Sequence, residues 1–277
     1  MTMPAEIKPH QSIELLKALH ILTRDGKLNQ DSRRKLKQVY HLVNFIEPLL
    51  DDVLSKTPNP TVVDHGAGKS YLGFILYDLL LKQQAAGQVV GVETRADLVE
   101  KSKALAQTCG FSRMDFHHLS VADSMTSTLI PEQVQIVTAL HACNTATDDA
   151  IQFGLNKQAQ YMVLVPCCQA EVAEVMRQLK AESLSKTGLS ELWRHPIHTR
   201  EFGSHITNVL RCLQLEAHGY QVTVTELVGW EHSMKNELII AKFTGQPKRA
   251  AQKRLQEILD MLNLNALQHR FGIGVAE

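Results

Sequence analysis

The chain has 277 residues, of which 44% are hydrophobic and 21% charged, and its formal net charge at pH 7 is zero. A chain of this length and ordinary globular composition buries a core large enough to fold without disulfides or a structural metal. The zero net charge gives no support for a strongly basic nucleic-acid binder, and no run approaches the roughly 18 apolar residues that a membrane span needs. An odd number of cysteines, five, and an N-terminus without an apolar leader predict a soluble protein of a reducing compartment, the cytoplasm.

The first 56 residues are predicted to form an N-terminal helical segment. Apolar residues between Gln11 and Leu54 follow helical spacing, with a break at Asp25-Gly26 and a second helix that begins near Asp31, its expected N-cap. The second helix carries a basic run, which is either its solvated face or a phosphate-contacting patch: Arg33, Arg34, Lys35 and Lys37. Both chain ends are basic, because residues 1–50 hold eight Lys/Arg against five Asp/Glu and residues 242–277 hold six against three.

From residue 57 onward, β-rich runs alternate with helical patterns, as in a parallel sheet with helical crossovers. Strands are predicted at Thr61–Asp64, Gln88–Glu93, Met114–Leu119, Val134–Leu140, Tyr161–Pro166, Gln221–Val228 and Glu237–Phe243. Helices are predicted at Tyr71–Lys82, Ala96–Thr108, Ala146–Leu155, Glu171–Ser183, Ile206–Ala217 and, as a basic amphipathic tail, Pro247–Leu264. Only about eight residues separate the last two strands, so the final strand is expected to be reversed and to close the sheet.

This order predicts an α/β, Rossmann-like fold of the class I methyltransferase type, with a mostly parallel seven-stranded sheet. It differs from the order of a nicotinamide-dependent dehydrogenase in its reversed terminal strand. Three regions are predicted: an N-terminal helical segment over 1–56, a Rossmann-like domain over 57–245 and a helical tail over 246–277.

The strongest local motif follows the first strand. Asp64 ends that strand, and the glycines at Gly66 and Gly68 permit a tight turn and close approach of a ligand. Ser70 stands where a dinucleotide-binding motif would have its third glycine. The alternative is an ordinary strand–turn–helix corner without a ligand.

Two further acids follow the next two strands. Glu93 lies 25 residues after Gly68 at a strand end, where a carboxylate can accept both ribose hydroxyl protons. Asp123 follows the third strand and is suited to accept from an adenine amino group, or else to cap a turn or helix.

The fourth and fifth strands end in residues able to line the same site, because ligands bind at the carboxyl ends of parallel strands. The fourth delivers Leu140, His141, Cys143 and Asn144, followed by Asp148 in the first turn of a helix. His141, Cys143, Cys167 and Cys168 have unusual spacing for a zinc site, and adjacent side chains on a strand diverge, so no metal is predicted.

A histidine cluster at His195, His198 and His205 precedes a predicted helix. Plain surface, a substrate-side loop and a metal site are the alternatives. Arg200 and Arg211 flank this segment and are suited to hold an anionic substrate or a carboxylate of the protein itself.

Several of these pieces together resemble one methyltransferase-domain family. They are the glycine loop, Leu140–Asp148, Pro166-Cys167-Cys168 and Lys235–Ile240, and the resemblance covers most of residues 30–243. The family includes the C-terminal domain of the glutathione S-transferase C-terminal domain-containing protein. The ribosomal RNA adenine dimethylase domain-containing protein looks like a relative, and a tRNA ribose methyltransferase has a similar cysteine pattern.

The resemblance implies S-adenosylmethionine as the cofactor. An acid before the glycines suits the positively charged methionine end of this sulfonium compound. The predicted cofactor-binding residues, which include Gln38 in the upstream part of the resemblance at Arg34–His41, are Gln38, Asp64, Gly66, Ala67, Gly68, Glu93, Asp123, Leu140, His141 and Asn144. Asn144 departs from the Asp or Gly expected in relatives.

RNA is the predicted methyl acceptor, ribosomal or transfer, contacted by Arg33, Arg34, Lys35 and Lys37. His141 and Asp148 are the candidate proton acceptors. The chain lacks both the Asn-Pro-Pro-Tyr run of amino-adenine methyltransferases and the Lys-Asp-Lys-Glu set of ribose enzymes. Methylation of a small molecule or a protein, and a non-catalytic module that binds S-adenosylmethionine, are the alternatives.

Overall fold

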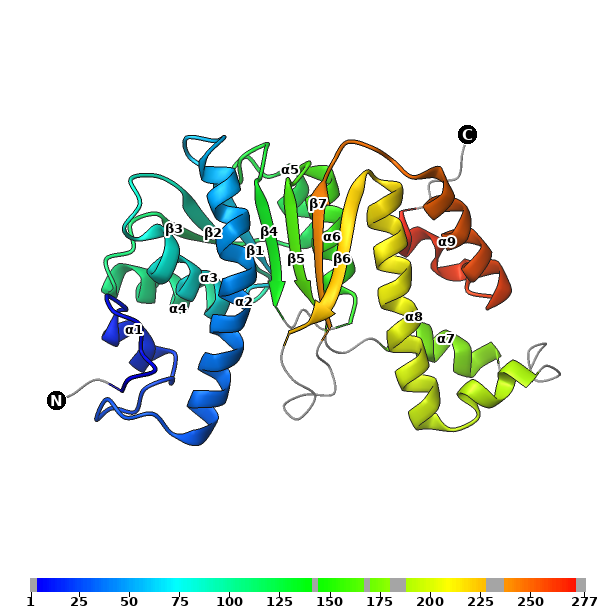
Figure 1. Cartoon of the computed structure of the whole chain (residues 1–277), viewed down its shortest axis with the longest axis horizontal. Helices are drawn as coiled ribbons and strands as arrows, with labels where there is room; N and C mark the ends of the chain where they lie inside the picture. Colours follow the sequence, from blue (N-terminus) through cyan, green and yellow to red (C-terminus); the bar gives the residue numbers. More distant parts are fainter. Residues whose placement is uncertain (1–3, 141–143, 167–169, 180–187, 228–236, 273–277) are drawn as a thin grey trace.

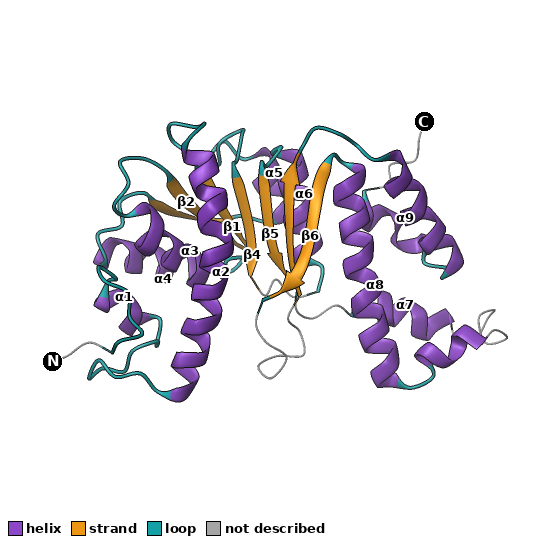
Figure 2. Ribbon diagram, viewed as in Figure 1, coloured by secondary structure: helices purple, strands orange, loops and turns teal. Residues whose placement is uncertain are grey.

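Seven strands form one sheet in the order β3-β2-β1-β4-β5-β7-β6 (Figures 1 and 2). The computed structural model describes residues 4–140, 144–166, 170–179, 188–227 and 237–272. The strands are β1 (Thr61–His65), β2 (Gln88–Glu93), β3 (Met114–His118), β4 (Ile136–Leu140), β5 (Tyr161–Val165), β6 (Tyr220–Glu226) and β7 (Glu237–Phe243). β1 to β5 pair in parallel, whereas β7 is antiparallel to both β5 and β6. The predicted class I, Rossmann-like fold is confirmed.

The final strand is reversed and pairs with the strand before it, as predicted. β7 is inserted between β5 and β6, so β6 and not β7 forms the edge. Burial explains this order, because Leu238, Ile239 and Ala241 of β7 are all buried while most of β6 is exposed or half-buried. A strand that is apolar on both faces belongs in the interior of a sheet.

The strand order of the sheet reverses between β1 and β4. β2 and β3 lie on one side of β1, and β4 and β5 on the other. Asp64 of β1 is in register with Gly91 of β2 and Thr138 of β4. Ligands of open α/β sheets bind at the carboxyl ends of the strands beside such a reversal, so the fold points to the end of β1.

Helices cover both faces of the sheet (Figure 2). One face packs against α2 (Gln30–Leu54), α3 (Tyr71–Leu76), η1 (Tyr77–Leu81) and α4 (Ala96–Thr108). The other packs against α5 (Val121–Thr126), α6 (Ala146–Asn156) and part of α8 (Pro196–Ala217). The α2 side chains that enter the core recur at helical spacing, which is why this helix forms and where it packs: Leu36, Val39, Leu42, Val43, Ile46, Leu50 and Val53.

Several predicted element boundaries are wrong. The N-cap of α2 is Asn29 and not Asp31, since the Asn29 side chain accepts a hydrogen bond from the Ser32 N–H at 2.7 Å. The helix after β1 changes to π-helical geometry over Tyr77–Leu81. The short helix α5 was not predicted, and α8 begins at Pro196, ten residues before the predicted start at Ile206.

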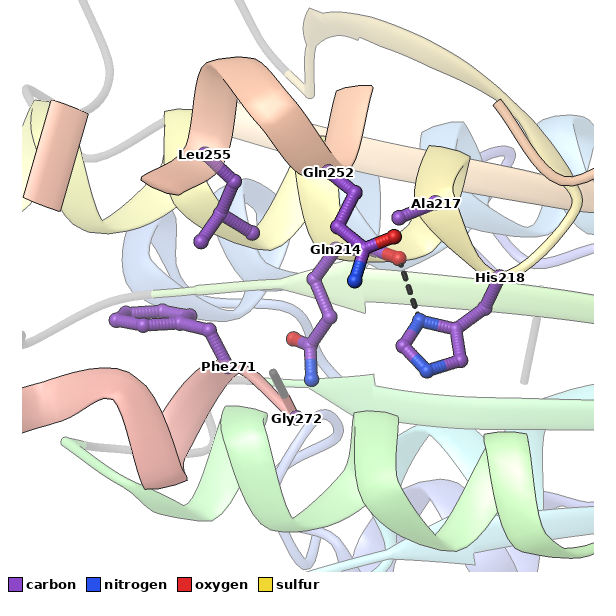
Figure 3. Close-up of a pocket in the computed structure, with 7 residues that line it drawn as sticks. All are labelled: Gln214, Ala217, His218, Gln252, Leu255, Phe271 and Gly272. Carbon is purple, nitrogen blue, oxygen red and sulfur yellow. Dashed lines mark hydrogen bonds between the residues drawn. The ribbon is translucent and has the colours of Figure 1, made fainter. Parts of the chain in front are cut away.

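The remaining elements lie at the two ends of the molecule (Figure 1). They are α1 (Ile13–Ala18), α7 (Glu171–Leu179), η3 (Gly188–Trp193), α9 (Arg249–Met261) and η4 (Asn265–Phe271). The predicted tail helix is α9, and it packs with η4 on α7 and α8. Between α8, α9 and η4 lies a small pocket lined by Gln214, His218, Gln252 and Phe271 (Figure 3).

Within the described ranges, no helix combines the length and the apolar character that crossing a lipid bilayer requires. The division into 1–56, 57–245 and 246–277 stays a prediction.

Candidate functional site

The turn after β1 is a loop of left-handed residues fastened to β2. Gly66 and Gly68 have φ angles of 66° and 58°, and Ser70, with φ of 48°, begins α3. The Ala67 N–H donates to the Val92 carbonyl at 3.0 Å, which holds the loop against the neighbouring strand. A Cβ built on Gly68 meets no atom within 4 Å, so this side of the loop is open to a ligand.

Asp64 is an internal anchor of this loop. Its side chain is buried, and its two carboxylate oxygens accept from Ser70 Oγ at 2.8 Å and Thr138 Oγ1 at 2.9 Å. Gly73 is required beside it, because a Cβ there would clash with Ser70 Oγ. Asp64 therefore joins β1, the glycine loop and β4, and it shapes the predicted cofactor site from beneath.

Glu93 faces the glycine loop from the end of β2. Its Oε2 accepts from the Gly68 N–H at 2.7 Å and its Oε1 from the Arg95 N–H at 3.0 Å. The side chain is only 11% exposed. A carboxylate in this position, next to an open glycine loop, is suited to accept ribose hydroxyls.

Asp123 takes the capping role that was its alternative. It is exposed in the first turn of α5, where Ser120 Oγ donates to Asp123 Oδ2 at 2.6 Å and accepts from the Asp123 N–H at 3.1 Å. This exchange is a reciprocal helix cap. The predicted adenine contact stays a prediction.

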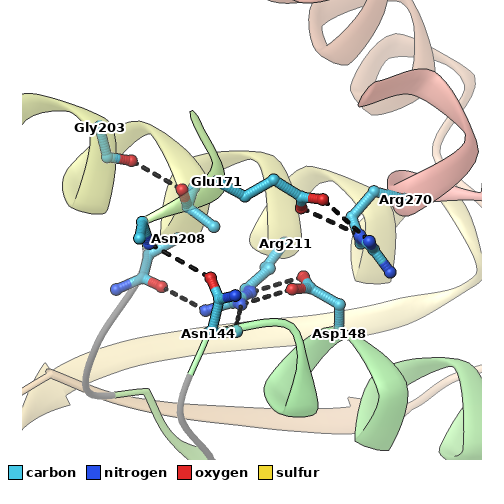
Figure 4. Close-up of polar contacts among 9 residues, drawn as sticks. Asn144, Asp148, Glu171, Gly203, Asn208, Arg211 and Arg270 are labelled. Carbon is cyan, nitrogen blue, oxygen red and sulfur yellow. Dashed lines mark hydrogen bonds and ion pairs between the residues drawn. The ribbon is translucent and has the colours of Figure 1, made fainter. Parts of the chain in front are cut away.

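The end of β4 is described on either side of residues 141–143. Leu140 is half-buried, while His141 and Cys143 lie outside the described residues. Asn144 has a left-handed φ of 53°, and its Oδ1 accepts from the Ala170 N–H at 3.3 Å (Figure 4). This bond links the segments that follow β4 and β5.

The geometry argues against Asp148 as a proton acceptor. Arg211 binds it in bidentate fashion, with Nε to Oδ1 at 2.7 Å and Nη2 to Oδ2 at 2.6 Å, and both side chains are almost completely buried. A buried carboxylate that faces a guanidinium with both oxygens is turned into the protein interior and away from an acceptor bound at the strand ends. Of the two roles foreseen for Arg211, the structure has the one in which it holds a carboxylate of the protein.

The histidine cluster lies on α8 and not in a loop. His195 is the N-cap of that helix, and His195, His198 and His205 are all exposed. In the described parts of the chain, no three His, Cys, Asp or Glu side chains gather closely enough to hold a metal ion. Cys167 and Cys168, like Cys143, lie outside those parts.

His65 stands inside the glycine motif and is a buried neighbour of the site that sequence reasoning did not single out. It is buried beside Phe153, with ring centroids 5.1 Å apart, and its Nε2 lies 3.5 Å from Ser124 Oγ. Burial lowers the pKa of its imidazole to about 4, so the ring is neutral at pH 7. The only sequence signal was its position after Asp64.

Gln38 is half-buried on α2, and the basic run lies on the same turns. Arg33 pairs with Glu6 at 2.7 Å, whereas Arg34, Lys35 and Lys37 are exposed. None of these three has an ion-pair partner among the residues that the structure describes.

With this geometry in place, comparison with known proteins identifies the family. A family model described as a methyltransferase domain matches residues 34–175, half of the chain, and spans the glycine loop, Glu93 and Asp148. The chain belongs to this methyltransferase-domain family.

The methyltransferase domain has distant relatives of known sequence and structure. It is 23% identical to the glutathione S-transferase C-terminal domain-containing protein of Bos taurus over 86% of this chain and 36% of that protein. Its identity to the Drosophila melanogaster homolog is 24%, over 77% of this chain and 37% of that protein. The chain thus spans about a third of these relatives' length.

Two solved structures have a similar fold. The magnesium protoporphyrin IX methyltransferase of Synechocystis PCC 6803, with bound SAH, has 13% identity and a TM-score of 0.48 over 83% of this chain and 94% of that one. The SAH-bound Podospora anserina methyltransferase has 10% identity and a TM-score of 0.47 over 84% and 88%.

As a member of this family, the chain is a methyltransferase domain that uses S-adenosylmethionine. The described residues fit this cofactor, because the open face of Gly68 and the carboxylate of Glu93 lie together at the carboxyl end of β1 and β2. Gly66, Ala67 and Gly68 would hold it through backbone contacts and Glu93 through its ribose. Asp64 shapes the loop from below.

Proposed function

We propose that this methyltransferase domain methylates RNA. The observation that carries the proposal is the group of exposed cations Arg34, Lys35 and Lys37 near the start of α2, none of which is ion-paired within the described ranges. In Figure 1 this end of α2 extends beyond the carboxyl ends of β4 and β5. The glycine loop follows the carboxyl end of β1, which runs parallel to β4. Unpaired cations beyond this end of the sheet would attract a polyanionic acceptor such as RNA.

Family resemblance supports the same acceptor class, since it extends to proteins whose names refer to ribosomal RNA and tRNA. The zero net charge does not oppose it, because the basic residues are concentrated at the two chain ends. Local fields, and not the net charge, steer a charged ligand.

Methyl transfer is an in-line displacement in which S-adenosylmethionine supplies the methyl group. The protein's main task is therefore alignment of the acceptor atom with the cofactor. Glu93 and the glycine loop orient the cofactor, and Asp64 keeps that loop in shape. His141 stays the proposed proton acceptor.

The deciding experiment follows radiolabelled methyl groups from S-adenosylmethionine into RNA, protein and metabolite fractions of cells that lack this protein. Label in the RNA fraction is the expected result. Label confined to protein or to metabolites would overturn the RNA proposal in favour of those acceptors. Tight cofactor binding with no label in any fraction would indicate a non-catalytic module.

A charge-reversal variant tests the cations themselves. The triple change Arg34→Glu, Lys35→Glu and Lys37→Glu should weaken RNA binding and reduce the slope of log affinity against log salt by about 2, as expected for three lost phosphate contacts on single strands. The control reverses Lys101 and Lys103, exposed cations on α4 that pair with Asp97 and Glu100. Equal salt slopes for the two variants would contradict an RNA surface on α2.

A further inference from the structure

One buried arginine on α8 connects the segments that follow β4 and β5 with the first residue of β7. Arg211 is completely buried, and its guanidinium donates to the carboxylate of Asp148 through Nε and Nη2. The same Nη2 donates to the Asn144 carbonyl at 3.1 Å, and Nη1 donates to Asn208 Oδ1 at 3.1 Å (Figure 4). Asp148 and Asn144 both belong to the segment after β4.

The contacts of Arg211 continue through its two amide neighbours. Asn208 Nδ2 donates to Glu237 Oε2 at 2.7 Å, which reaches the first residue of β7. Asn144 Oδ1 accepts from the Ala170 N–H, which reaches the segment after β5. We call the connected set of Arg211, Asp148, Asn144 and Asn208 the Arg211 hub.

Stability alone does not account for such a hub. The desolvation of a buried ion pair offsets most of its Coulombic attraction, and replacement by apolar side chains of similar volume is often neutral or stabilising. What an apolar pair cannot supply is fixed geometry, because only the planar guanidinium holds a carboxylate, a backbone carbonyl and an amide oxygen at once. The Arg211 hub is therefore suited to hold backbone in place.

We infer that Arg211 is a positioning residue of the methyl-transfer site. By holding Asn144 and Asp148, it fixes the first turn of α6, which follows β4, the strand that pairs with β1 at the assigned cofactor site. Arg211 itself touches neither cofactor nor acceptor and acts through the backbone at Asn144. This inference rests on the assignment of the cofactor site and does not depend on RNA as the acceptor.

The test separates stability from binding with the double variant Arg211→Met/Asp148→Leu, compared with the single change Arg211→Met. The single change leaves Asp148 buried and unpaired, so a large fall in Tm is expected. The double change removes both charges, and Tm should return to within a few degrees of the wild type. SAH binding, measured by calorimetry, should nevertheless remain at least tenfold weaker, because the Asn144 carbonyl has lost its donor.

A matched control is the ion pair of Arg270 and Glu171, which is also bidentate, with distances of 3.0 and 2.9 Å, and lies beside the hub (Figure 4). Arg270 donates both of these bonds to Glu171, which is not a member of the Arg211 hub. The double variant Arg270→Met/Glu171→Leu should bind SAH as the wild type does. An equal loss of SAH affinity in this control would overturn the special role of Arg211.

The outcomes are distinguishable. Wild-type stability together with wild-type SAH affinity in the Arg211→Met/Asp148→Leu variant would show a purely structural pair and overturn the inference. If that variant does not regain stability, Arg211→Lys is the deciding variant, because lysine keeps the positive charge but cannot donate in the planar geometry of a guanidinium. SAH affinity weakened severalfold in Arg211→Lys supports the inference, and unchanged affinity overturns it. Failure of the wild-type chain to bind SAH would instead overturn the cofactor site.

Discussion

Two neighbouring residues at the end of β1 have pKa values shifted by burial in opposite senses. Burial raises the pKa of Asp64 from 3.8 to about 6, despite the opposing hydrogen bonds from Ser70 and Thr138. Burial also lowers the pKa of His65 from 6.5 to about 4. Burial thus favours the neutral form of each residue: the His65 ring is neutral at pH 7, and the Asp64 carboxyl ionises only as the pH rises through about 6.

The two shifts make opposite contributions to the pH dependence of stability. Unfolded Asp64 loses its proton near pH 4 while the folded carboxyl keeps it to about pH 6, so this residue makes the fold less stable as pH rises through that window. Unfolded His65 gains a proton below about pH 6.5 while the folded ring does not until about pH 4, so this residue makes the fold more stable as pH rises. In the wild type the two slopes largely cancel.

Single substitutions should expose each slope. In His65→Gln only Asp64 still titrates, so the free energy of unfolding should fall as the pH rises from about 4 to about 6. In Asp64→Asn only His65 still titrates, so the free energy of unfolding should rise as the pH rises from about 4 to about 6.5. Urea unfolding at half-unit pH steps measures both. Parallel pH profiles for the wild type and both variants would contradict the opposed pair.

Glu93 is the residue whose removal should affect cofactor affinity most directly. Glu93→Ala removes the acceptor of the Gly68 N–H and the proposed acceptor for ribose hydroxyls, so S-adenosylmethionine binding should weaken by roughly 1–3 kcal/mol. Calorimetry on the purified protein measures this loss. The control Asp115→Ala removes an acid that is 63% exposed on β3 and should bind the cofactor normally. Normal affinity in Glu93→Ala would place the ribose elsewhere.

At the scale of elements, the sequence pattern predicts best where a strand or helix is determined locally. β2, β7 and α4 have the predicted bounds, since each is a clear apolar pattern between turn or capping residues. The start of α8 was missed because residues 196–205 are mostly polar. Their helix forms by close packing, with Gly203 so near Ala173 that no Cβ fits between them. Pro196 at the first helical position was the available signal.

The residues of the candidate site likewise divide into those that local sequence spacing predicts and those that only long-range packing brings together. Asp64, the glycines and Glu93 lie together because their spacing follows from strand–turn–helix geometry. The partner of Asp148 could not be predicted, because Arg211 lies 63 residues away and only the packing of α8 against α6 brings the two side chains together. The Ser70–Asp64–Thr138 bonds were missed for a similar reason, since Thr138 comes from a strand 74 residues along the chain.

α8 also carries a buried side-chain amide that gains no hydrogen bond from the described residues. Gln214 is completely buried, and within the described residues neither its amide nitrogen nor its oxygen has a hydrogen-bond partner. An unsatisfied buried amide costs about 1–3 kcal/mol, so Gln214→Met, which keeps the shape, should raise the free energy of unfolding by about 1 kcal/mol. The exposed Gln107 on α4 supplies the control, Gln107→Met, with little change expected. Destabilisation by Gln214→Met would reveal a partner in the adjoining pocket.

At the scale of the whole molecule, the N-terminal helices and the sheet share one hydrophobic core. Leu15, Leu16 and Ile46 belong to the same buried cluster as Val62 of β1 and Val163 of β5. Polar contacts follow the same route, because the Tyr71 hydroxyl donates to the Leu19 carbonyl and the Ser12 N–H to Asp78 Oδ2 at 2.9 Å. Residues 1–56 therefore contribute side chains to the same hydrophobic core as the sheet.

A chain shortened to residues 57–277 should therefore fail to fold cooperatively. Deletion of residues 1–56 would expose the face of the sheet that α2 covers. It would also remove a set of completely buried side chains, and truncation of even one such side chain to alanine lowers the free energy of unfolding by about 2–5 kcal/mol. That sum exceeds the 5–15 kcal/mol by which a domain is usually stable. Near-UV circular dichroism and ANS fluorescence measure the outcome, and the full chain with Ile46→Ala, a single buried truncation, is the graded control, expected to fold with reduced stability. Cooperative unfolding of the shortened chain with a native-like near-UV spectrum would show instead that residues 1–56 form a separable unit.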